Sequence, residues 1–86
     1  MKVIAIDFDG VIYFKKHIEK VNTAREKIWK LFDNRDNFIV IYTARPEIYR
    51  KEIEKFLRDN NVPYHALVTG KIRADVYIDD KSRRKL

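Results

Sequence analysis

Acidic side chains occur in two close pairs, and each pair follows a short apolar run. Asp7 and Asp9 interrupt the stretch IAIDFDGVIY, and Asp79 and Asp80 follow the apolar residues VYI. Clustered carboxylates repel one another, and a cation relieves that repulsion. The chain has no Cys, so any bound metal must sit on oxygen or imidazole. These acids therefore predict a site for a hard, oxygen-preferring ion, with Mg²⁺ as the default.

Four further residues suit a bound phosphate group. Thr43 offers a small hydroxyl donor, and Lys71 offers a point charge. Gly10 lets the backbone turn tightly, so that its amides can approach an anion. Arg45 could bind substrate or pair with Glu47, and both alternatives stay open. An aspartate placed in line with phosphorus can act as a nucleophile and form an acyl phosphate.

The elements that must position these residues alternate between strand and helix patterns. We expect strands at residues 2–8, 38–42, 64–68 and 75–78, and helices at residues 23–34 and 46–59. Such alternation is typical of βαβ units and a parallel sheet. The first helix is expected to begin at a capping box of Thr23 and Glu26, after an irregular excursion over residues 11–22. The second is expected to bury one side that includes Ile48 and Tyr49.

Polar residues collect where these predicted strands end. In an open α/β sheet, ligands bind outside the carboxyl ends of the strands. Four strand ends are followed by acids, a hydroxyl and cations, namely Asp7, Asp9, Thr43, Arg45, Lys71, Asp79 and Asp80. The sequence therefore predicts one site at this edge of the sheet.

In this order the motifs resemble the haloacid dehalogenase-like (HAD) superfamily of phosphotransferases. DFDGV looks like its motif I, IVIYT like motif II with Thr43, Lys71 like motif III and YIDD like motif IV. The likeness covers nearly the whole chain, taken as one catalytic domain over residues 1–86. It implies an α/β fold with a three-layer, Rossmann-like parallel sheet of about four strands in the order 3-2-1-4, without a cap domain.

The resemblance also implies an activity and a role for each site residue. The chain would be a Mg²⁺-dependent phosphomonoester hydrolase that acts through an aspartyl phosphate. Asp7 would be the nucleophile and Asp9 the general acid and then the general base. The metal would be held by Asp7, Asp9, Asp79 and Asp80, with the backbone carbonyl of Asp9 as a further ligand. Catalysis would also use Thr43 and Lys71, and the phosphate would be bound by Gly10, Thr43, Arg45 and Lys71.

Charge and hydropathy favour a cytoplasmic, soluble protein with no membrane partner. The longest purely apolar run covers residues 38–42, far short of the roughly 20 residues that span a bilayer. Four of the six net positive charges lie in residues 81–86, so the rest of the chain is nearly balanced. That basic tail is either solvated or attracts phosphate-rich substrates. His17 and His65 are expected at the surface or partly buried, and not as ligands.

Two other functional classes stay open. A phosphoacceptor receiver domain also combines an acid pair, a Thr and a Lys in a doubly wound fold. Receivers carry the acceptor Asp at the end of the third strand, where this chain has Val68 and Thr69. A nucleic-acid-binding partner module would use the basic tail. For the hydrolase, the substrate could be a small phosphorylated molecule or a polymer end, nucleic acid included, and the site could be covered by a second copy in a homo-oligomer.

Overall fold

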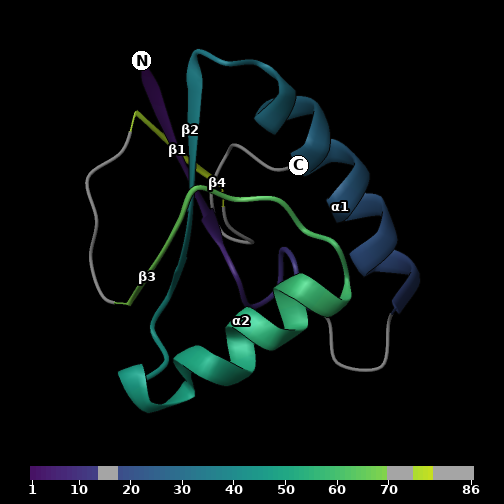
Figure 1. Cartoon of the computed structure of the whole chain (residues 1–86), viewed down its shortest axis with the longest axis vertical. Coiled ribbons are helices and arrows are strands. Elements are labelled where there is room, and N and C mark those ends of the chain that lie inside the picture. Colours follow the sequence, from purple (N-terminus) through teal and green to yellow (C-terminus); the bar gives the residue numbers. More distant parts are fainter. Residues whose placement is uncertain (14–17, 70–74, 79–86) are drawn as a thin grey trace.

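The computed structural model describes residues 1–13, 18–69 and 75–78 (Figure 1). Its elements are β1 (Lys2–Asp7), α1 (Ile18–Asp33), β2 (Asn37–Thr43), the 3₁₀ helix η1 (Glu47–Tyr49), α2 (Arg50–Asp59), β3 (Ala66–Thr69) and β4 (Val76–Ile78). The expected α/β class is confirmed. Within this described part, neither α1 nor α2 is long and apolar enough to cross a membrane.

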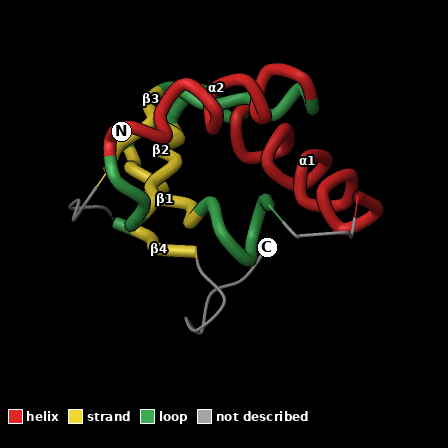
Figure 2. The backbone as a smooth tube through the Cα atoms, turned by 90° about the horizontal axis from the view of Figure 1, so that it is seen from below, coloured by secondary structure: helices red, strands yellow, loops and turns green. Residues whose placement is uncertain are grey.

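The sheet is parallel, with its strands in the order β3-β2-β1-β4. β1 pairs with β2 from Lys2 opposite Asn37 to Asp7 opposite Tyr42. On its other side, β1 pairs with the short strand β4. Figure 2 shows β3, β2, β1 and β4 side by side in this order, with α1 to one side of them. β1 is therefore central, and its carboxyl end lies between those of β2 and β4.

The core lies on one face of the sheet. Paired residues of parallel strands point to the same face, and Ile4 lies opposite Ile39 as Ile6 lies opposite Ile41. The same cluster of buried side chains takes residues from these strands and from both helices, namely Ile4, Ile6, Ile39, Ile41, Ile28, Ile53 and Leu57. Both described helices thus pack against this face. The described residues make two layers, and no described helix supplies the expected third.

The first helix begins earlier than the sequence predicts. α1 starts at Ile18, and the Thr23 hydroxyl donates to the Glu19 carbonyl at 3.2 Å. Thr23 therefore lies inside the helix, and the predicted capping box is wrong. The apolar stripe explains the difference, because Val21 is buried one turn before Ala24 and extends the buried face of the helix.

The second helical segment is divided in two. After Pro46, residues 47–49 form a 3₁₀ turn before α2 begins at Arg50. A 3₁₀ turn has about three residues per turn, so its side chains do not keep the phase of the following α-helix. Ile48 is consequently 83% exposed and Tyr49 43% exposed. The expectation that both line the buried side is wrong.

Candidate active site

The backbone after β1 folds into a tight turn that starts at Asp9. The Phe8 carbonyl accepts hydrogen bonds from the amides of Ile12 at 3.1 Å and Tyr13 at 2.9 Å, and the Gly10 amide donates to the Tyr13 carbonyl at 3.0 Å. Gly10 has a φ of 81°, in the left-handed region that glycine enters without steric cost. The glycine therefore lets the chain reverse direction directly beyond the acidic motif.

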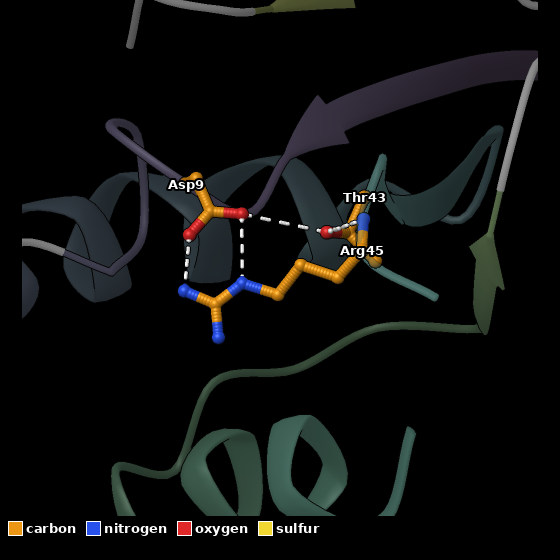
Figure 3. Close-up of polar contacts among 3 residues, drawn as sticks. All are labelled: Asp9, Thr43 and Arg45. Atoms are coloured by element: carbon orange, nitrogen blue, oxygen red, sulfur yellow. Dashed lines mark hydrogen bonds and ion pairs between the residues drawn. The ribbon is translucent and has the colours of Figure 1, made fainter. Parts of the chain in front are cut away.

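Three predicted site residues meet at the carboxyl ends of β1 and β2 (Figure 3). Arg45 holds the carboxylate of Asp9 with two nitrogens, Nη2 at 2.6 Å from Oδ1 and Nε at 3.2 Å from Oδ2. The Thr43 hydroxyl lies 3.4 Å from the same Oδ2 and accepts the Arg45 amide at 3.1 Å. This forked geometry is the strong form of an ion pair between arginine and a carboxylate.

The trio combines a buried hydroxyl with a partly exposed ion pair. Thr43 is fully buried, whereas the side chains of Arg45 and Asp9 are 37% and 44% exposed. The hydrogen bond to Asp9 raises the pKa of Arg45, and burial opposes that shift only in part. Arg45 is therefore a permanent cation at the solvent-facing edge of the site.

Aromatic rings support the guanidinium of Arg45. Its Cζ lies 5.6 Å from the ring centroid of Phe8 and 5.4 Å from that of Tyr13, distances typical of cation–π contacts. These two rings, the ring shelf, are nearly parallel, and Phe56 of α2 meets both of them edge-on. Tyr13 is not among the site residues predicted from the sequence, and it lies in the stretch expected to be irregular. The one feature of the sequence that could have indicated Tyr13 is that this aromatic residue lies close to the acidic motif.

A second polar network joins the start of α2 to the end of β3. Arg50 pairs with Glu47 and donates through Nη1 to the Leu67 carbonyl at 2.9 Å. The Thr69 hydroxyl donates to Glu47 at 3.1 Å, and the bond from Arg50 lowers the pKa of Glu47. Glu47 pairs with Arg50, and Arg45 pairs with Asp9. The alternative of an Arg45–Glu47 pair is therefore wrong. The network fixes the strand end that precedes Lys71 in the sequence.

The remaining predicted residues are only partly described. Asp7 is the last residue of β1 and is half-buried, while Lys71, Asp79, Asp80 and His17 lie outside the described residues. Within residues 1–13, 18–69 and 75–78, no three acidic or histidine side chains gather closely enough to hold a metal ion. Asp7 and Asp9 nevertheless offer the oxygen donors that Mg²⁺ prefers. A metal ion that bound the Asp9 carboxylate would compete with Arg45 for its oxygens.

No protein-family model, curated protein sequence or solved structure matches the chain.

Proposed function

We propose that the chain is a Mg²⁺-dependent phosphomonoester hydrolase of the HAD type. The meeting of Asp9, Thr43 and Arg45 at adjacent strand ends carries this proposal. An acid, a small hydroxyl and a cation are the groups needed to move a proton and to bind a phosphate. They lie at the edge of a parallel sheet where α/β proteins bind ligands.

The reaction divides the labour between the two acids at the carboxyl end of β1, Asp7 and Asp9. A carboxylate oxygen of Asp7 attacks phosphorus, the bond from phosphorus to the leaving oxygen breaks, and Asp9, in its protonated form, gives that oxygen its proton. Asp9 then takes a proton from water, which attacks the phosphorus of the acyl phosphate and releases inorganic phosphate. Both carboxyl groups return to their starting state, as a catalytic cycle requires.

The phosphate is held by groups from several strand ends. Thr43 can donate its hydroxyl to a phosphate oxygen, and its own position is fixed by the bond from the Arg45 amide. Lys71 and Arg45 neutralise charge. The Gly10 amide itself donates to the Tyr13 carbonyl, so the contribution of Gly10 is the tight turn that it allows. The ligand can be a small phosphorylated molecule or a phosphorylated polymer end, in a cytoplasmic setting.

The residues present fit a magnesium ion as the partner of this site. The Asp7 carboxylate, the Asp9 backbone carbonyl, Asp79 and Asp80 would hold it, and all of these are hard oxygen donors. When bound, the ion supplies positive charge that offsets the repulsion between Asp7 and the phosphate.

The alternative of a receiver-like phosphoacceptor is less well supported. β3 ends at Thr69, so the position of a receiver's acceptor aspartate carries no carboxylate. A nucleic-acid-binding module would rest on residues 81–86, outside the described part. Its binding to nucleic acid should fall steeply as salt rises.

Hydrolysis of an aryl phosphate tests the proposal. The full chain should release phenolate with Mg²⁺ present and stop in excess chelator, and Asp7→Asn should be inactive. Asp36→Asn is the matched control, since Asp36 is exposed and pairs with the amino terminus away from the site. Full activity of Asp7→Asn, or activity unchanged by chelator, would contradict the proposal.

A further inference from the structure

Arg45 is held from two sides in the free protein. Asp9 binds two of its nitrogens, and the ring shelf of Phe8 and Tyr13 lies against its guanidinium. The third nitrogen, Nη1, points away from the carboxylate (Figure 3), and the side chain is 37% exposed. The guanidinium can therefore meet an anion from solvent without leaving its aromatic support.

The groups that the proposed reaction needs are bound to each other in this state. Oδ1 of Asp9 accepts a hydrogen bond from Nη2 of Arg45. Oδ2 of Asp9 accepts hydrogen bonds from Nε of Arg45 and from the Thr43 hydroxyl. To act on a leaving oxygen, Asp9 must be released. To present the same Nε–Nη2 edge to a phosphate, Arg45 must be released as well. A single exchange of partners accomplishes both.

We propose that Arg45 stays on Asp9 in the free protein and transfers to the substrate's phosphate, which frees the Asp9 carboxylate to take up a proton from solvent. This inference rests on the proposed phosphate site. A phosphomonoester dianion offers two oxygens in the fork geometry of a carboxylate and carries one more charge than Asp9, so it can displace it. A phosphodiester is a monoanion without that advantage. Arg45 thereby makes the site selective for monoesters.

The experiment follows the Nε–Hε nuclear magnetic resonance signal of Arg45, identified by its loss in Arg45→Lys. Wild-type protein and Asp9→Asn are compared free, with Mg²⁺ alone, and then with Mg²⁺ and rising inorganic phosphate. Without phosphate the two proteins should give different Arg45 signals, because only one has the carboxylate partner. At saturating phosphate the signals should converge, because Arg45 then contacts phosphate in both proteins.

Other outcomes separate this inference from the proposed function. Signals that still differ at saturating phosphate, in a protein that hydrolyses aryl phosphate, would overturn the exchange and leave the phosphatase proposal standing. Convergence with Mg²⁺ alone would show that the cation opens the pair, and would overturn the role of phosphate. Failure of phosphate to bind, together with absent hydrolysis, would overturn both. Dimethyl phosphate, a monoanion, should need roughly tenfold or more concentration to shift the signal.

The ring shelf supplies a second test that leaves both charged residues in place. Tyr13→Phe keeps the ring under Arg45, whereas Tyr13→Leu keeps apolar bulk without a π face. We expect Tyr13→Phe to retain the wild-type Arg45 signal and its convergence with phosphate. Tyr13→Leu should broaden the free signal and weaken phosphate binding by several-fold. Equal behaviour of the two variants would overturn the role of the shelf.

Discussion

His65 completes the pairing of β2 with its side chain as well as its backbone. Its Nδ1 accepts the Ile39 amide at 2.9 Å, and its own amide donates to the Ile39 carbonyl at 2.8 Å. The imidazole is also stacked between the rings of Phe32 and Phe38. One side chain thus supplies both a hydrogen-bond acceptor for a strand and an aromatic contact at the amino end of the sheet.

Two substitutions of His65 should separate these contributions. His65→Phe keeps a stacking ring but leaves the Ile39 amide without its acceptor, so we expect a loss of about 1 to 3 kcal/mol in the free energy of unfolding. His65→Asn keeps an acceptor at the same distance along the side chain and loses the stack. Urea unfolding at neutral pH measures both. A His65→Phe protein as stable as wild type would show that the hydrogen bond contributes nothing.

The proposed division of labour between Asp7 and Asp9 can be tested by trapping the acyl phosphate that it requires. An aryl phosphate has a good leaving group, so Asp9→Asn should still be phosphorylated on Asp7. The second step then lacks its general base and should slow by roughly 10²- to 10⁴-fold. Intact-protein mass spectrometry after an acid quench should find one added phosphoryl group in Asp9→Asn and none in Asp7→Asn. Slow turnover of Asp9→Asn without a covalent species would indicate direct attack by water.

The Glu47–Arg50 pair should make stability depend on pH in acid. The pKa of Glu47 is lowered in the folded state from its ordinary value of 4.5, chiefly by the hydrogen bond from Arg50. Its contribution is therefore fully present above that value and is lost as the pH falls through the folded pKa. Melting temperatures across pH should show a constant gap between wild type and Glu47→Gln near neutrality that closes in acid.

Glu26→Gln is the control for this measurement, because Glu26 is an exposed carboxylate on α1. Its melting temperature should follow that of wild type across the same range. A gap for Glu47→Gln that widens in acid would contradict the direction of the shift.

Two isoleucines five positions apart should respond differently to the loss of one methylene group. Ile53 is 2% exposed and Ile48 is 83% exposed. We expect Ile53→Val to cost about 1 kcal/mol, which lowers the melting temperature of a domain this size by roughly 4 to 8 °C. Ile48→Val should change it little. Equal effects of the two substitutions would contradict the described start of α2.

Strand alternation and motif order were enough to predict the α/β class and the meeting of Thr43 with Asp9, because parallel strands end at a common edge. The start of α1 was missed because a Thr-x-x-Glu spacing occurs inside helices as well as at their ends. The ion pair of Arg45 with Asp9 was not predicted, because the common edge of the strands indicates which residues lie close together but not which of them pair. Ile48 was misplaced because periodicity does not reveal a change from 3₁₀ to α geometry.

The long span between β1 and β4 bears on how the molecule folds and opens. The backbone of Val3 binds the side chain of Asp75, 72 positions along the chain, and β4 is only three residues long. Closing so large a loop costs entropy that few contacts offset, so β4 should dock last in folding and detach first in local opening. Asp79 and Asp80 directly follow β4 in the sequence. If Asp79 and Asp80 hold the metal as proposed, activity should therefore disappear through a partial opening that leaves the pairing of β1, β2 and β3 intact.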